Sequence, residues 1–286
     1  MVNGNDKNKV GYVLITGAYG GMGYKTAKLL SEKGFTVFAL DKKVNAAEPN
    51  IFPIETDITD TENIKHAYDI VKAQTSGLDA IIHFAGVYML DSLVEMKEER
   101  FTKIFDINVF GTYRVNKIFL PLLSAGSTIV ITSSELAPLN PLPFTGIYAI
   151  TKTALEKYAF SLRMELQLLG INVSVLRPGA VKTGLLSAST AELDNFCKNT
   201  KIYTYNAEKF KKITSSVEAK NVLPEKIAKK ALHAITARHP KYVYNINKNP
   251  LLRILNILPK KIQTKIIGKI LKPEKSNKTF SKNKEK

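Results

Sequence analysis

The sequence predicts an α/β protein built on one doubly wound parallel sheet with helices on both faces. Short, continuously apolar runs alternate with stretches of helical period from residue 10 to residue 176. Strands that are buried on both faces read as continuous apolar runs, and the helices between them serve as right-handed crossovers. The chain has 286 residues, of which 44% are hydrophobic, so it suits one large domain with a sizeable core.

The first predicted unit is a strand, a glycine loop, a helix and a second strand. Val10 to Ile15 is the first strand, and Tyr24 to Lys33 has the period of a helix that Gly34 closes. Phe35 to Leu40 is the second strand, and it ends at the acid Asp41. A strand that leads through glycines into a helix is the context in which a glycine loop binds a dinucleotide.

The same alternation continues toward the C-terminus. Further strands are expected at 51–55, 78–84, 128–132 and 172–176, with a last short one at 241–244. Further helices are expected at 61–74, 98–123 and 148–169. Residues 184–222 lack a period and are expected to form a long irregular substrate loop. The chain is therefore divided into a dinucleotide-binding catalytic domain at 1–245, basic amphipathic helices at 246–272 and a disordered tail at 273–286.

The glycine loop predicts where the pyrophosphate of a dinucleotide binds. Gly17, Gly21 and Gly23 form the pattern T-G-x-x-x-G-x-G directly after the first strand. Backbone N–H groups at a helix start point at an anion, and the helix dipole adds to the attraction. The expected sheet is therefore of the Rossmann type.

Asp41 favours NAD as the cofactor. It lies at the tip of the second strand, where a carboxylate accepts hydrogen bonds from the adenosine ribose and repels a 2′-phosphate. Gly20 leaves no basic side chain inside the glycine loop to offset that repulsion. Lys42 and Lys43 argue for NADP, since either can reach a 2′-phosphate, so NADP stays open. A bland alternative is that Asp41 only ends a strand.

Tyr148 and Lys152 form the candidate catalytic pair. They are four residues apart at the start of a predicted helix, so they share one face. A tyrosine with a pKa of about 10 is a poor acid or base at neutral pH, but a neighbouring ammonium favours the phenolate. Tyr148 can then exchange a proton with an alcohol or a carbonyl. Such a pair also occurs by chance, so its surroundings decide.

Those surroundings resemble the short-chain dehydrogenase/reductase family, in particular its hydroxysteroid- and retinol-dehydrogenase-like members. The resemblance covers roughly Val10 to Thr183. The matching segments, in family order, are Thr16 to Gly23, Asp57, Asn108, Ile131 to Ser134, Tyr148 to Lys152, and Pro178 to Thr183.

The resemblance implies hydride transfer between a nicotinamide cofactor and a secondary alcohol or ketone. Tyr148 is then the general acid/base, and Lys152 lowers its pKa and binds the nicotinamide ribose. Ser134 hydrogen-bonds the reacting oxygen, and Asn108 holds a water in a proton relay. The implied cofactor-binding residues are Gly17, Tyr19, Gly21, Met22, Gly23, Asp41, Asp57 (near the adenine), Ile58, Ala85, Gly86, Lys152, Pro178, Gly179, and Val181 and Thr183 (at the carboxamide). No metal is expected.

The chain departs from the family pattern at two places. Phe84-Ala85-Gly86 stands where the family has Asn-Ala-Gly, so a polar side chain is lost while the glycine is kept. The gap from Ser134 to Tyr148 is about one residue longer than expected, which leaves Ser133 as a second candidate. His83, in a buried strand with no partner motif, is interpreted as structural.

The expected substrate is lipophilic. Its pocket should be walled by residues 135–146, residues 184–222 and the C-terminal tail, all fairly apolar. The apolar residues expected there are Leu136, Leu139, Leu142, Phe144, Leu185, Leu186 and Phe196. Two other functions stay open: a 3-oxoacyl thioester reductase, whose acidic carrier would suit the basic chain, and a sensor or scaffold that binds NAD without turnover.

The C-terminal tail concentrates the positive charge. Residues 246–286 hold twelve basic and two acidic residues, so they carry +10 of the net charge of +17. Within 260–271, Ile262, Ile266 and Ile270 recur at helical spacing beside a row of lysines. Such a helix either lies on a membrane surface or packs its apolar face on the substrate lobe. A nucleic-acid partner is not expected, because interleaved aromatics are missing.

The remaining expectations concern location and assembly. Cys197 is the single cysteine, and the first nine residues are polar, so a cytoplasmic protein is expected, with membrane association at most peripheral. No run of about 18 apolar residues predicts a spanning helix. The family resemblance implies a homodimer or homotetramer that pairs through the helices carrying Asn108 and Tyr148.

Overall fold

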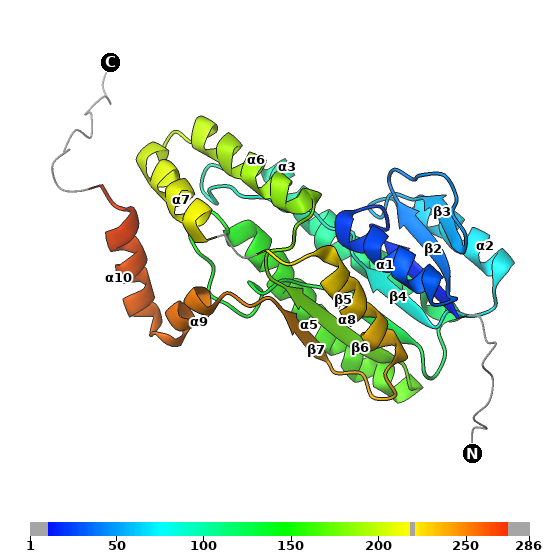
Figure 1. Cartoon of the computed structure of the whole chain (residues 1–286). Helices are drawn as coiled ribbons and strands as arrows, with labels where there is room; N and C mark the ends of the chain where they lie inside the picture. Colours follow the sequence, from blue (N-terminus) through cyan, green and yellow to red (C-terminus); the bar gives the residue numbers. More distant parts are fainter. Residues whose placement is uncertain (1–10, 218–220, 274–286) are drawn as a thin grey trace.

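The computed structural model describes residues 11–217 and 221–273, which form a seven-stranded parallel sheet flanked by helices (Figure 1). The strand order is β3-β2-β1-β4-β5-β6-β7, so the direction of winding reverses between β1 and β4. The predicted doubly wound α/β class is confirmed. The strands are β1 (Tyr12–Thr16), β2 (Thr36–Asp41), β3 (Ile51–Glu55), β4 (Ala80–His83), β5 (Thr128–Thr132), β6 (Asn172–Pro178) and β7 (Val243–Ile246).

Helices cover both faces of this sheet because side chains alternate along each strand. Val13 and Ile15 of β1 pack under α1 and α8, whereas Leu14 between them packs under α2 and α4. Helix α5 covers β5 and β6 on the same face as α2 and α4. These helices are α1 (Gly21–Glu32), α2 (Thr61–Gln74), α4 (Thr112–Phe119), α5 (Gly146–Leu166) and α8 (Pro224–Thr236).

The helix predicted over 98–123 is helical throughout but irregular. It comprises α3 (Glu98–Phe105), a π-helical turn over Asp106–Gly111, α4 and a 3₁₀ turn over Leu120–Leu122. π-helical turns are rare and occur frequently at functional sites. Here the turn contains Asn108, one of the four predicted catalytic residues.

The prediction of an irregular loop over residues 184–222 is wrong. The segment folds into α6 (Gly184–Asn199) and α7 (Thr204–Val217), which pack on each other. Few of their side chains are buried, chiefly Leu193 and Phe196 of α6 and Ala207 and Phe210 of α7, so the apolar period is hard to see in a polar sequence. Helix α8 was also not predicted, and the last strand lies two residues later than expected.

The basic C-terminal segment contains two helices, α9 (Pro250–Ile257) and α10 (Lys260–Leu271), at one end of the molecule beyond α7 (Figure 1). The inner side of α10 packs Ile267 and Leu271 against α7. The packing alternative is therefore correct for Leu271 only, because Ile262 and Ile270 of the expected apolar row are exposed. No helix within 11–217 and 221–273 has the length and apolar composition that a membrane span requires. The expectations for the first ten residues and for the tail beyond residue 273 concern residues outside the described part of the chain.

Candidate active site

The four predicted catalytic residues meet at the carboxyl end of the sheet. Tyr148 and Lys152 lie in the first two turns of α5, Ser134 follows β5, and Asn108 lies in the π-helical turn. All four are buried, with 7%, 5%, 7% and 1% of their surfaces exposed in that order. Residues from three separate elements therefore share one water-poor site at the edge where ligands bind open α/β sheets.

Tyr148 is held as a neutral phenol. Burial raises its pKa to about 12, and a hydrogen bond with the Ser134 hydroxyl acts in the opposite direction. The Lys152 ammonium lies 5.7 Å from the centroid of the Tyr148 ring. On another side, the ring of Tyr88 packs against that of Tyr148 with centroids 4.7 Å apart. At neutral pH Tyr148 is thus a buried proton donor beside a cation.

Burial also acts on Lys152, whose pKa it lowers to about 8. The ammonium donates a hydrogen bond to the carbonyl oxygen of Thr132, the last residue of β5, over 3.1 Å. Lys152 therefore remains largely protonated at neutral pH, and among the described residues only one of its three ammonium protons has a hydrogen-bond acceptor. The other two are available to hydroxyl or water oxygens.

Asn108 is fixed by three hydrogen bonds. Its Oδ1 accepts from the N–H of Val87 over 2.8 Å, and its Nδ2 donates to the Val87 carbonyl over 3.0 Å. Nδ2 also donates to Oγ1 of Thr151 over 3.2 Å. A β-carbon on Gly86 would lie 3.2 Å from Asn108 Oδ1 and 3.6 Å from Lys152 Nζ, so the glycine leaves space beside both side chains.

The choice between the two serines is decided by their partners. Ser133 donates to the main-chain carbonyl of Lys152 over 3.4 Å, so its hydroxyl is turned toward the backbone of α5. Ser134 instead hydrogen-bonds Tyr148 and accepts from the N–H of Leu136 over 3.2 Å. Ser134 is the serine that shares the site with the tyrosine.

The glycine loop is shaped by close backbone contacts. Gly17 has φ +66°, and a β-carbon there would lie 2.5 Å from the backbone nitrogen of Ala85. A β-carbon on Gly23 would lie 2.1 Å from the Gly17 oxygen, and one on Gly21 would lie 2.7 Å from the Thr183 side chain. Helix α1 begins at Gly21 with no side-chain cap, so its first N–H groups can receive a phosphate.

The tip of β2 carries a fixed carboxylate. Asp41 Oδ2 accepts from the N–H of Tyr19 over 2.9 Å, and Oδ1 accepts from the N–H of Lys42 over 2.8 Å. The Lys42 side chain turns away to Asp57, with Nζ 2.7 Å from Oδ2. Burial raises the pKa of Asp57, but the hydrogen bonds from Lys42 and Thr59 outweigh it, so the net shift is downward.

The other predicted cofactor residues lie around this loop or at neighbouring strand ends. The buried hydroxyl of Tyr19 has no hydrogen-bond partner among the described residues, as expected of a group that faces a ligand. Thr183 lies against Gly21, and Val181 pairs with Val222 at the base of α6 and α7. The remaining predicted residues are placed as follows: Met22 in α1, Ile58 against Gly111, and Pro178 and Gly179 at the end of β6.

His83 lies apart from this chemistry, as the sequence suggested. Its Nε2 is 2.8 Å from Oδ1 of Asn116, and its Nδ1 is 3.5 Å from Oγ1 of Thr16. Burial lowers the pKa of His83 to about 4, so the ring is neutral at pH 7. Asn116 in turn donates to the hydroxyl of Tyr158 over 3.0 Å, which links β1, β4, α4 and α5.

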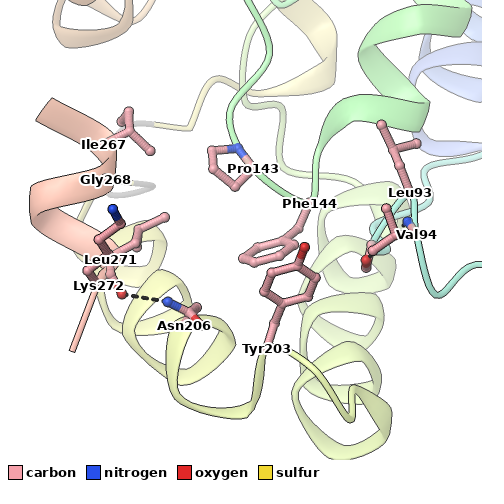
Figure 2. Close-up of a pocket in the computed structure, with 11 residues that line it drawn as sticks. Leu93, Val94, Pro143, Phe144, Tyr203, Asn206, Ile267, Gly268, Leu271 and Lys272 are labelled. Carbon is pink, nitrogen blue, oxygen red and sulfur yellow. Dashed lines mark hydrogen bonds between the residues drawn. The ribbon is translucent and has the colours of Figure 1, made fainter. Parts of the chain in front are cut away.

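An apolar cavity of about 320 Å³ lies between α7, α10 and two loops (Figure 2). Tyr148 is not part of its wall, but Tyr88 packs both on Tyr148 and into the cluster that contains Phe144. Phe144 and the C-terminal helix were predicted to line the pocket, whereas the wall at 92–94 was not. The lining residues are Ser92, Leu93, Val94, Pro143, Phe144, Tyr203, Asn206, Ile267, Gly268, Leu271 and Lys272.

Comparison with known proteins agrees with this geometry. Residues 11–194 match the short chain dehydrogenase family, and the chain belongs to that family. Estradiol 17-beta-dehydrogenase 2 of Mus musculus is 34% identical over 258 residues, covering 81% of this chain and 67% of its own. The chain is therefore an oxidoreductase of the NAD(P)-dependent class, acting by hydride transfer.

Solved structures share the fold with either cofactor bound. A 3-ketoacyl-(acyl-carrier-protein) reductase from Brucella melitensis complexed with NADH has a TM-score of 0.67 and 18% identity, covering 82% of this chain and 96% of its own. A short chain dehydrogenase from Burkholderia cenocepacia in complex with NADP has a TM-score of 0.69 and 19% identity, covering 92% and 98%. At these identities the likeness concerns the fold alone. The glycine cradle, the uncapped start of α1 and the orphaned Tyr19 hydroxyl fit a nicotinamide dinucleotide.

Proposed function

We propose that the protein oxidises a lipophilic secondary alcohol, or reduces the corresponding ketone, with NAD as the preferred cofactor. The observation that carries this proposal is the buried triad of hydroxyl, phenol and ammonium formed by Ser134, Tyr148 and Lys152. Oxidation of a secondary alcohol removes a hydride from carbon and a proton from oxygen, and ketone reduction returns both. The cofactor accepts or supplies the hydride, so the protein must handle the proton.

Each residue has a distinct role in that proton transfer. Tyr148 gives or takes the proton at its phenolic oxygen, and the Ser134 hydroxyl holds the substrate oxygen beside it. The Lys152 ammonium favours the phenolate form and uses its free protons to bind a ribose hydroxyl. Asn108 keeps the π-helical turn next to Lys152 and orders the water that connects this site to solvent. The side chains of Val181 and Thr183 orient the carboxamide end of the cofactor.

NAD is favoured over NADP by the state of the charges at the tip of β2. Asp41 is held at this tip by two backbone N–H groups and presents its negative charge where a 2′-phosphate would lie. Lys42, which could offset that charge, is already paired with Asp57. Lys43, the other lysine that could reach a 2′-phosphate and so favour NADP, is exposed.

A lipophilic substrate is supported by the apolar cavity and by the similarity to estradiol 17-beta-dehydrogenase 2. Ligand pockets of this kind have volumes of about 300–1,000 Å³. The cavity of about 320 Å³ is at the lower end of this range. Its wall is formed mainly by aliphatic and aromatic side chains, with Ser92, Asn206 and Lys272 as the polar exceptions.

The proposal includes a homodimer or homotetramer. It also includes a cytoplasmic location, which the single cysteine supports because it suits a reducing compartment. The helices that carry Asn108 and Tyr148 continue into an outer surface with large exposed apolar side chains. Phe110, Tyr113, Phe160 and Met164 are 50%, 44%, 50% and 52% exposed. Apolar groups gathered on one face mark an interaction surface.

The proposal also includes peripheral membrane contact through α10, where Ile262 and Ile270 are exposed beside lysines.

The test measures turnover of hydroxysteroids, retinol and simple secondary alcohols with NAD or NADP, and it monitors the absorbance of the reduced cofactor. Wild-type turnover should fall about 10²–10⁴-fold in Tyr148→Phe, with the cofactor Kd unchanged. Equal turnover in both proteins removes Tyr148 from the mechanism. Cofactor binding without turnover on any alcohol or ketone contradicts the proposal; activity on an acyl-carrier thioester instead would identify a 3-oxoacyl reductase.

A further inference from the structure

Helix α9 presents an apolar ridge to solvent. Leu251, Ile254 and Ile257 are 62%, 61% and 81% exposed and follow one another at a spacing of three residues. Residues three apart are neighbours on a helix surface, so the three side chains form one row. Pro250 and Arg253 line a shallow groove together with the two isoleucines. Single exposed apolar residues are ordinary, but a continuous row of them marks a contact surface.

The segment that contains this ridge is strongly basic. Between residues 247 and 273 the chain has seven basic residues and no acidic one. On α10, Ile262 is exposed on the same side as the exposed lysines Lys265 and Lys269, at spacings of three and seven. The seven basic residues are Lys248, Arg253, Lys260, Lys261, Lys265, Lys269 and Lys272.

We propose that α9 and α10 dock on an anionic membrane surface, with the ridge of Leu251, Ile254 and Ile257 inserted among the lipid head groups. An apolar helix face bordered by lysines lies stably at such an interface, since apolar burial and attraction to anionic lipid add together. A second copy of this chain is a poorer occupant. A twofold interface brings the same patch of both subunits together, which would oppose seven positive charges with seven more.

The hairpin of α9 and α10 is tied to the loop that follows the catalytic serine. The N–H of Asn249 donates to Oε2 of Glu135 over 2.6 Å, and the N–H of Asn140 donates to Oδ1 of Asn256 over 2.6 Å. Nδ2 of Asn140 donates to Oε1 of Gln263 over 3.1 Å. The inner side of α10 lines the apolar cavity (Figure 2). If the proposed lipophilic substrate is correct, docking places this cavity next to the bilayer that dissolves it.

Vesicle sedimentation of the full chain tests the docking surface without any need for turnover. Binding should be clear on phosphatidylcholine vesicles that contain phosphatidylserine, weak on phosphatidylcholine alone, and lost in high salt. The triple variant Leu251→Gln, Ile254→Gln, Ile257→Gln should weaken binding at least tenfold, on the order expected for losing three apolar side chains from the interface. Ile202→Gln, which changes an isoleucine that is 63% exposed elsewhere, should bind like wild type.

The charge contribution is tested separately. Lys261→Glu, Lys265→Glu and Lys269→Glu together should weaken binding about a hundredfold or more, since each basic residue near an anionic surface contributes about fivefold. A matched triple change of exposed lysines, Lys33→Glu just after α1 and Lys229→Glu and Lys230→Glu on α8, should have a much smaller effect.

Three outcomes overturn the proposal. One is the absence of phosphatidylserine-dependent binding by the wild type, and another is an equal loss in the control variants. The third is a lower mass of the α9 triple variant in light scattering without lipid, which would make the ridge an interface between copies. Because binding is read without substrate, a failure here leaves the turnover test untouched, and a protein without turnover can still bind the vesicles.

Discussion

The catalytic end of the sheet and the lobe formed by α6, α7, α9 and α10 are held together in different ways. At the catalytic end, backbone contacts leave almost no freedom: a β-carbon on Gly23 would lie 2.1 Å from a backbone oxygen. In the lobe, a β-carbon on Gly268 of α10 would meet nothing closer than the Lys272 side chain at 4.0 Å. The catalytic end is therefore tightly constrained by geometry, while the wall of the apolar cavity can change with few consequences for the rest of the fold.

The sharpest test of that difference is Gly23→Ala, which should abolish measurable cofactor binding. Its methyl group must displace the Gly17 carbonyl and thus the loop that receives the pyrophosphate. Gly184→Ala is the matched control, because it also lies at the start of a helix and a β-carbon there meets nothing within 4 Å. Calorimetric titration with NAD compares the two, and circular dichroism establishes that both fold. Normal NAD binding by Gly23→Ala would contradict the proposed cradle.

Lys152→Met should reduce kcat/KM for alcohol oxidation by about two to three orders of magnitude. The loss follows from the ammonium that favours the phenolate of Tyr148, whose pKa burial raises to about 12. The pH–rate profile should also change: oxidation rises with pH as the phenolate forms, and in the variant that rise shifts to higher pH. Lys157→Met, an exposed lysine on the same helix, should leave rate and profile unchanged. An unshifted profile in Lys152→Met would assign the lysine to ribose binding alone.

The sequence predicted most of the catalytic end because its signals are local. The glycine loop, Asp41 and the tyrosine–lysine pair are each read within a few residues, and the order of strands places them at one edge of the sheet. Two features of this end escaped prediction. Tyr88, which packs on Tyr148, lies in a segment that carries no motif. Thr132 belongs to the matched segment 131–134, but the hydrogen bond from Lys152 to its carbonyl depends on how β5 and α5 meet in space.

The lobe could be predicted only in outline. The isoleucine spacing predicts α10 as a helix, but the sequence of α6 and α7 predicts a loop because their buried residues are few and their outer faces are polar. The cavity wall at Leu93 and Val94 has no local signal either, since it depends on how the loop after β4 meets α10 in space. Apolar packing between segments can be satisfied by many sequences, and so it leaves little trace in any one of them.

The buried ring of His83 leads to a prediction about the stability of the fold rather than about activity. Its pKa is about 4 in the folded chain against an ordinary value of 6.5, so the unfolded chain binds the extra proton first as the pH falls. Its contribution is fully present above pH 6.5 and is lost as the pH falls from 6.5 to 4. The loss reaches about 3 kcal/mol at most.

Urea unfolding at several pH values should therefore show a smaller pH dependence for His83→Gln than for the wild type. Gln keeps an amide that can hydrogen-bond Asn116 but takes up no proton in this range. His66→Gln, which changes an exposed histidine of α2, should retain the wild-type dependence. Identical slopes for wild type and His83→Gln would mean that the buried ring is not the origin of the acid sensitivity.

Asp41→Ser should relax the cofactor preference by about tenfold. Removing the carboxylate takes away the repulsion of a 2′-phosphate and the acceptor for the ribose hydroxyls, so the Kd for NADP falls while that for NAD rises. Asp69→Ser, on the exposed side of α2, is the control for a simple change in net charge. If the wild type already binds NADP more tightly than NAD, the assignment of Asp41 as the discriminating residue is wrong.

The smallest expected effect belongs to the lobe and concerns substrate size. Gly268 lines the cavity, and space surrounds its missing side chain, so Gly268→Phe should fill part of the volume of about 320 Å³ without disturbing the packed core. The KM for a hydroxysteroid should rise several-fold to tenfold, on the scale of hydrophobic pocket discrimination, while kcat for a small secondary alcohol stays the same. Gly268→Ala controls for the backbone, since it adds helix propensity but little volume. A parallel loss of kcat on both substrates would place the cavity in the catalytic machinery, whereas no change in KM for the steroid would show that the substrate lies elsewhere and that the cavity serves another ligand.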